Sequence, residues 1–137
     1  MEQFLRLLYL MLFLTLYFGG HFVAPVLLVW GWVRWIRSIK PLTFWPMLSL
    51  IGFFFVSASA LCAVSLFLYS LRLGGGLEHF DDRLFMGIFQ WGELLARIAI
   101  AFGIAGMWRA NPLRWHSPVC ALATLMFWLD TGGAFVI

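Results

Sequence analysis

The sequence predicts an all-α integral membrane protein, whose four transmembrane helices form an antiparallel bundle with short loops. Its 137 residues are 64% hydrophobic and 11% charged, whereas soluble domains average about 45–50% and about 25%. A chain this small cannot hide so much apolar surface from water. Four apolar stretches also reach the roughly 20 residues that a helix needs to cross a bilayer. The composition therefore excludes a soluble enzyme, a disordered tail and a disulfide scaffold.

We expect a single domain over residues 1–137, with spans at about 4–33, 44–71, 84–108 and 119–137. The connections between these spans are too short to hold a further domain. The first apolar stretch is also much longer than the about 7–15 residues of a signal-peptide core. We therefore expect it to be retained as the first helix.

The first span contains Gly19-Gly20-His21 and then Pro25. A proline inside a helix removes the hydrogen bond to the carbonyl four residues earlier, which predicts a kink near His21. The imidazole of His21 can serve as an axial ligand for a haem or a chlorin. A hydrogen bond into the bundle is the preferred interpretation of a single membrane histidine, and cofactor binding is the alternative.

The second span begins after Thr43 and ends at the triple glycine of residues 74–76, where left-handed backbone is needed. Small side chains, such as those of Ser57, Ser59 and Cys62, occur on nearly every side of it. Such residues let membrane helices approach closely, so we expect this helix to be central.

The third span carries a stripe of small residues that recur at steps of four and three: Gly92, Ala96, Ala99, Gly103 and Gly106. At about 100° per residue these positions share one helix face. Small residues on one face favour close helix packing in lipid. Packing within one bundle is the preferred interpretation of this stripe, and a subunit interface is the alternative. Asp81 or Asp82 is the expected N-cap.

A second stripe on the third span holds Gln90, Glu93 and Arg97. Glu93 and Arg97 are one helical turn apart, so their charged groups can meet. Charged side chains in membrane helices normally face protein or water. We therefore expect lipid on the remaining face, which holds Trp91, Leu95, Ile98 and Phe102.

The fourth span begins, by its sequence, with Ser117 as N-cap and Pro118 in the first turn. Its one acidic residue, Asp130, has an expected depth close to that of Glu93, which allows a cluster of Asp130, Arg97 and Glu93. The preferred interpretation is a structural ion pair between the third and fourth spans. The alternatives are a contact with a partner subunit and a pathway for protons or ions.

The charges predict the orientation of the chain. Residues 34–43 and 109–118 carry five basic side chains: Arg34, Arg37, Lys40, Arg109 and Arg114. The opposite side carries three basic side chains, and four acidic side chains on that side lower its net charge. The positive-inside rule then places both termini outside the cytoplasm. We expect an integral protein of a bacterial inner membrane or another energy-transducing membrane, whose net charge of +3 faces lipid and needs no nucleic acid.

Glu78, His79, Asp81 and Asp82 lie close together in the second loop, but their spacing matches no established metal-binding pattern. Helix capping explains them better, and we expect no metal ion. Cys62 and Cys120 lie at depths that differ by roughly 20 Å, which is too far for a disulfide.

The sequence contains no recognisable catalytic motif, and its aromatic content is 19%. The leading hypothesis is a structural or accessory subunit of a larger membrane complex, bound to other membrane subunits or to copies of itself. The second is a small homo-oligomeric transporter or channel that uses Glu93, Arg97 and Asp130. The third is a subunit that binds a cofactor or pigment through His21.

Overall fold

A computed structural model describes residues 2–38, 43–76, 79 and 81–133, with the side chains of residues 13–21 outside the description. The described residues form four α-helices: α1 (Glu2–Arg37), α2 (Phe44–Arg72), α3 (Arg83–Gly106) and α4 (His116–Gly133). No β-strand occurs among these residues. The predicted all-α class is therefore confirmed.

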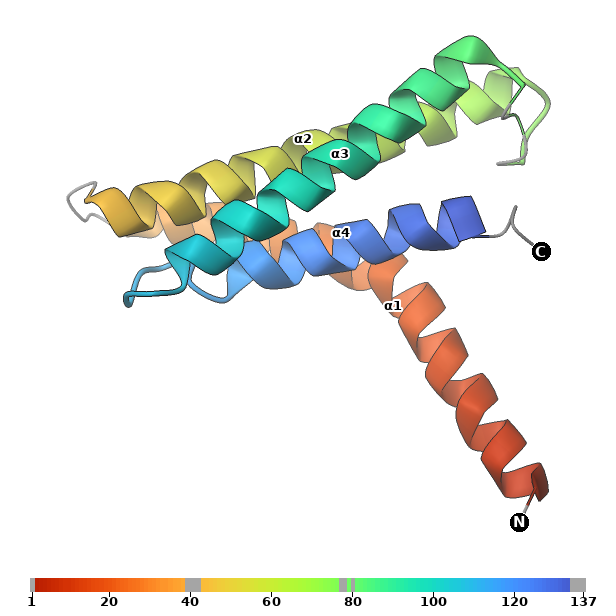
Figure 1. The fold of residues 1–137 in the computed structure, drawn as a ribbon, viewed down its shortest axis with the longest axis horizontal. Coiled ribbons are helices and arrows are strands. Elements are labelled where there is room, and N and C mark those ends of the chain that lie inside the picture. Colours follow the sequence, from red (N-terminus) through yellow and green to blue (C-terminus); the bar gives the residue numbers. More distant parts are fainter. Residues whose placement is uncertain (1, 39–42, 77–78, 80, 134–137) are drawn as a thin grey trace.

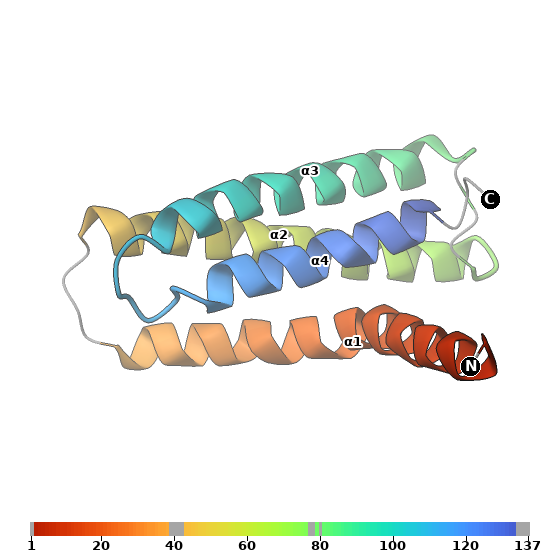
Figure 2. The same cartoon turned by 60° about the horizontal axis from the view of Figure 1, so that its bottom comes forward.

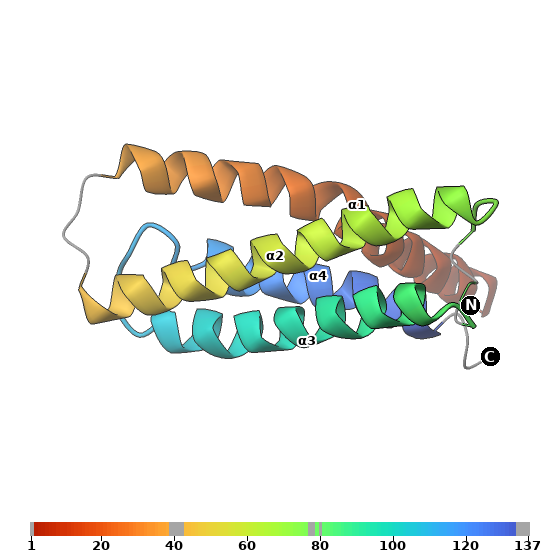
Figure 3. The same cartoon turned by 90° about the horizontal axis from the view of Figure 1, so that it is seen from above.

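Consecutive helices run in opposite directions, so that α1 begins and α4 ends at the end of the molecule where α2 connects to α3 (Figure 2). The most extensive helix contact is between α2 and α3, which lie side by side (Figure 3). Helix α4 packs against both of them, and α1 packs mainly against α4. We refer to α2, α3 and α4 as the three-helix core.

Helix α1 joins this core along only part of its length. Figure 1 shows α1 changing direction, so that its N-terminal part diverges from the other helices. The helix remains continuous through Pro25, and the bend agrees with the kink that this proline predicts. Every described residue from Glu2 to Leu12 is exposed, because no other helix reaches this part of α1.

The helix ends follow local sequence signals closely. Gly74, Gly75 and Gly76 have φ of 102°, 84° and 85°, which places all three in the left-handed region that favours glycine. Asp82 caps α3 by accepting hydrogen bonds from the backbone N–H groups of Leu84 and Phe85.

The predicted start of the fourth helix is wrong. Helix α4 begins at His116, and the backbone N–H of Ser117 donates to the Leu113 carbonyl 3.0 Å away. Ser117 is therefore already inside the helical hydrogen-bond pattern, and its hydroxyl group is fully buried instead of capping the helix. The preceding turn is formed by Asn111, whose side-chain oxygen accepts from the Leu113 N–H at 3.0 Å.

Two of the described helices, α2 and α3, are long and apolar enough to cross a membrane. Helix α1 extends beyond the predicted span at both ends, but the side chains of residues 13–21 are not described. Helix α4 has 18 residues, which include the polar side chains of His116 and Asp130. The predicted residues 134–137 of its span lie outside the described residues.

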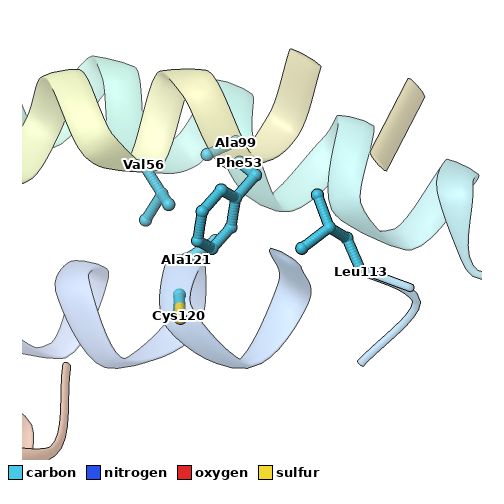
Figure 4. Close-up of a cluster of buried hydrophobic side chains, with 6 residues drawn as sticks. All are labelled: Phe53, Val56, Ala99, Leu113, Cys120 and Ala121. Atoms are coloured by element: carbon cyan, nitrogen blue, oxygen red, sulfur yellow. The ribbon is translucent and has the colours of Figure 1, made fainter. Parts of the chain in front are cut away.

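The apolar core consists of two clusters. The first contains Phe53, Val56, Ala99, Leu113, Cys120 and Ala121. Figure 4 shows the ring of Phe53 reaching from α2 toward Cys120 and Ala121 of α4. The second cluster contains Leu66, Phe85, Phe89, Ala96 and Trp128. Side chains from α1, such as Trp32 and Trp35, pack only at the border of the first cluster.

Candidate functional site

The most completely buried polar site joins all three helices of the core. The indole Nε1 of Trp128 in α4 donates a hydrogen bond of 2.8 Å to Ser59 Oγ in α2. The Ser59 hydroxyl in turn donates to the Gly92 carbonyl in α3 at 2.6 Å. Trp128 and Ser59 are both 0% exposed. We call this chain of two hydrogen bonds the core relay.

Gly92 leaves the space that the tryptophan ring fills. A Cβ atom at this position would overlap three atoms of the Trp128 indole. Two further rings hold that indole in place, because Phe89 and Phe127 make edge contacts with centroids 5.5 Å and 5.1 Å away. The absence of a side chain at Gly92 therefore determines how closely α3 and α4 approach each other.

The other small residues of the predicted stripe also face the interior of the chain. All five positions are buried. A Cβ at Gly103 would lie 3.0 Å from the backbone nitrogen of Pro118 in α4, and one at Gly106 would lie 2.7 Å from that of Ser49 in α2. The stripe therefore packs against both neighbouring helices, with backbone close to backbone.

A second relay connects α1 to the core. Trp32 Nε1 donates to Ser57 Oγ at 3.0 Å, and the Ser57 hydroxyl donates to the Phe53 carbonyl at 2.8 Å. The rings of Trp32 and Phe53 also make an edge contact, with centroids 5.4 Å apart. Trp32 and Ser57 are half-buried. We call this pair of hydrogen bonds the α1 relay.

The predicted charged stripe lies on the opposite side of α3. The guanidinium of Arg97 pairs with the Glu93 carboxylate within the helix, and Gln90 is exposed beside them. The side chain of Arg97 is 62% exposed and that of Glu93 is 22% exposed. Because α2 and α4 both pack on the small-residue face, Arg97 points away from the core, while Glu93 lies mostly covered beside it.

The expected lipid face of α3 is wrong in part. Trp91 is exposed as predicted, but Leu95, Ile98 and Phe102 are half-buried. The ring of Phe102 stacks on Phe55 of α2, with centroids 5.8 Å apart. The extensive contact between α2 and α3 covers part of this side of the helix, whereas Gln90, Leu94 and Arg97 are exposed.

Asp130 lies half-buried on α4 and takes part in an interaction. Helix α4 packs on the small-residue face of α3, whereas the Glu93–Arg97 pair lies on the outer face. A cluster of all three residues stays a prediction. The backbone of His21 lies within α1, but its side chain lies outside the described residues, and so does Glu78.

The second loop is organised around the cap of α3. His79 Nε2 lies 3.0 Å from the Gly75 carbonyl, and the Tyr69 hydroxyl donates to Asp82 Oδ2 at 3.2 Å. The Phe85 N–H, which donates to the carboxylate, holds the pKa of Asp82 below its ordinary value of 3.8.

In the part of the chain that the structure describes, no three His, Cys, Asp or Glu side chains gather closely enough to hold a metal ion. Both cysteines are free.

Sequence reasoning did not identify Trp128 or Ser59 as partners. The available signal is a tryptophan inside a predicted span, away from its ends, which indicates a buried ring but does not identify its partner. Six of the eight tryptophans occur instead near the predicted membrane surface.

Comparisons of this chain with protein-family models, with curated proteins and with solved structures find no match.

Proposed function

We propose that this chain is a structural or accessory subunit of a larger membrane assembly, with all four helices in the bilayer. The observation that carries this proposal is the Glu93–Arg97 pair on the outer face of α3. In a single copy of the chain the Arg97 side chain is 62% exposed, so the charged pair is open on one side. A partner that covers it is the simplest way to keep it in a membrane.

The depth of the pair gives this argument its strength. Glu93 is ten residues from the start of α3 and Arg97 is nine residues from its end, which correspond to about 15 Å and about 13 Å of helix. Both residues are then near the middle of a hydrocarbon layer about 30 Å thick. Charged groups at this depth are costly in lipid and normally face protein or water.

Helix α1 supplies a second surface for a partner. Its N-terminal part diverges from the core (Figure 1), and its large apolar side chains from Phe4 to Leu12 are all more than half exposed. A diverging apolar helix opens space in which a helix from another subunit can pack. In this proposal, the basic loops at residues 34–43 and 109–118 face the cytoplasm, following the positive-inside rule.

A second copy of the chain is the alternative partner. One outer face carries both an acid and a base, so two copies related by a two-fold axis can pair Glu93 of each with Arg97 of the other. Such a homo-oligomer supports the second candidate function, a small transporter or channel in which Asp130 contributes a further titratable group.

The test uses a charge exchange that preserves the pair within α3. The double variant Glu93→Arg, Arg97→Glu keeps opposite charges one turn apart but reverses the pattern that a partner meets. We expect wild-type protein, purified from its native membranes in mild detergent, to carry unrelated chains that this variant loses. Arg83→Gln is the control, because it removes an exposed charge at the end of the same helix.

Mass spectrometry and mass photometry of the purified material separate the outcomes. Unrelated chains on wild type and on Arg83→Gln, but not on the exchanged variant, support the subunit hypothesis. Copies of this chain alone support the homo-oligomer instead. A wild-type monomer in native membranes, checked by chemical crosslinking before extraction, contradicts both.

A further inference from the structure

We propose that a groove on the C-terminal part of α1 binds one anionic phospholipid of the cytoplasmic leaflet. The groove accommodates an acyl chain, and Arg34 and Arg37 hold the phosphate. This inference rests on the membrane location in the proposed function, but it does not depend on any protein partner.

The groove lies on the face of α1 that is turned away from the core. It is an open groove of about 800 Å³, and all of its lining residues belong to the C-terminal part of α1 and the residue that follows it. Its apolar wall includes Val26, Val29 and Val33, which are 63%, 63% and 42% exposed. Apolar side chains that recur at this spacing form a continuous strip along one helix face.

The length of the groove matches one leaflet. Val26 and Arg37, both in its lining, are eleven residues apart, which corresponds to about 16 Å of helix. One leaflet is half of a hydrocarbon layer about 30 Å thick. An acyl chain that lies along the valines therefore ends near the bilayer centre when its phosphate is at Arg37.

The charges at this end of α1 favour an anionic lipid over a neutral one. Arg34 and Arg37 are exposed at the end of α1 and line the groove. No carboxylate occurs in residues 34–43 or 109–118, the two loops at this end of the bundle. The ion pair between Glu93 and Arg97 lies within α3 and involves neither arginine of the groove. The two arginines thus have no acidic residue in the adjoining loops, and a lipid phosphate is a suitable partner for them.

Trp30 adds an aromatic ring to the apolar wall on the side of the arginines. Its side chain lines the groove and is 63% exposed, and it lies one helical turn before Arg34. Indole rings prefer the headgroup region of a bilayer, where the ring is partly apolar and the N–H can find a partner. Val26 and Val29 come before Trp30, and Val33 lies between Trp30 and Arg34. The apolar side chains therefore start nearer the bilayer centre, and the two arginines lie nearest the headgroups.

The first measurement is lipid selectivity. Purified, delipidated protein is reconstituted in equal amounts of phosphatidylcholine and phosphatidylglycerol, recovered in mild detergent, and its retained lipids are measured by mass spectrometry. We expect enrichment of phosphatidylglycerol by about fivefold for each arginine. Arg34→Gln, Arg37→Gln should abolish the enrichment. The control Arg6→Gln, Arg72→Gln, which removes the same charge at the opposite end, should retain it.

The second measurement locates the lipid. A photoreactive residue at position 29, activated in native membranes, should crosslink to phospholipid, and the same residue at position 61 on the exposed side of α2 should show no preference for anionic lipid. Crosslinking of position 29 to another protein identifies the groove as a protein interface and overturns the proposal. Equal enrichment in the arginine variant and wild type overturns it as well.

Extraction of membranes with alkaline carbonate separates this inference from the proposed function. Release of the chain from the membrane contradicts both. A retained chain without lipid selectivity contradicts only the lipid site. Lipid selectivity in a chain without protein partners contradicts only the subunit function.

Discussion

The core relay and the α1 relay each combine a tryptophan with a serine, but the two pairs lie in different settings. In each, a tryptophan N–H donates to a serine of α2, and the serine donates to a backbone carbonyl. The core relay ends on α3, so it connects three helices through fully buried atoms. The α1 relay ends on α2 itself, so it connects only two helices and is half-buried.

This difference shows which part of the molecule is built to be rigid. Buried hydrogen-bonded groups are costly to separate, because a donor left without an acceptor loses its full solvation. The core relay therefore resists any movement of α2, α3 or α4 against one another. The α1 relay resists only the separation of α1 from α2, and the N-terminal part of α1 diverges beyond it (Figure 1). Helix α1 is thus the element most free to adapt to a partner or to lipid.

The largest effect is expected from removing a relay tryptophan. Trp128→Ala removes a fully buried ring together with its hydrogen bond, and such changes cost about 3–5 kcal/mol in unfolding free energy. Trp32→Ala should cost clearly less, because Trp32 is half-buried. Thermal unfolding in one mild detergent measures both. Equal losses for the two variants contradict the distinction between a rigid core and a peripheral α1.

A smaller effect is expected from filling the space opposite Trp128. In Gly92→Ala the new methyl group overlaps the indole, which Phe89 and Phe127 hold in place. Overpacking of this kind typically costs about 1–3 kcal/mol. Gly87→Ala is the matched control on the same helix, because a Cβ there meets no atom within 4 Å. It should be neutral or slightly stabilising. A destabilised Gly87→Ala beside a stable Gly92→Ala would place the interface elsewhere on α3.

Local features of the fold could be predicted from the sequence. The triple glycine after α2 and the Asp82 cap depend only on nearby residues, so their backbone requirements are visible in the sequence itself. The small-residue face of α3 was also visible, since its spacing follows the helical repeat. A few neighbouring residues determine each of these features, so the local sequence is enough to predict it.

Pairings between helices could not be predicted in the same way. Ser59 is one of several serines in α2, and no local rule selects it as the residue that meets Trp128, 69 positions away. The predicted lipid face of α3 differs from the structure for a related reason. Periodicity groups the residues by face, but it does not tell which neighbour covers Phe102, and α2 covers it through Phe55.

Removal of a relay hydroxyl should have a more modest effect than removal of the ring. Ser59→Ala leaves the Trp128 N–H and the Gly92 carbonyl without their shared partner, and hydrogen bonds between membrane helices contribute about 1–2 kcal/mol in model systems. Ser57→Ala should cost less, because the α1 relay is only half-buried. Ser65→Ala, on an exposed side of α2, controls for the loss of a hydroxyl. A larger loss for Ser57→Ala than for Ser59→Ala, by thermal unfolding, reverses our ranking of the relays.

The smallest expected effect concerns acid, which should act on the cap of α3 and on neither relay, because the relays contain no titratable group. The core has a titratable link at its end, where Asp82 caps α3 and accepts from Tyr69 of α2. The Phe85 N–H, more than any other group, lowers the pKa of Asp82 in the folded chain below its ordinary value of 3.8. The folded state therefore favours the ionised carboxylate. The resulting stabilisation is complete above pH 3.8 and disappears as the pH falls through the lower, folded-state pKa.

Hydrogen exchange of the first turn of α3, measured in detergent from pH 6 downward after correction for the intrinsic pH dependence of exchange, tests this link. Protection in wild type should fall below about pH 4, while protection around Ser57 in the middle of α2 stays constant. Asp82→Asn retains an oxygen that accepts from the N–H groups, so it should keep most of the cap but lose its dependence on pH. Asp82→Ala should lower protection at every pH, because no side-chain oxygen remains. If Asp82→Asn and wild type lose protection over the same pH range, another group titrates there. The acid sensitivity of the core would then have to be assigned to a different carboxylate than the cap of α3.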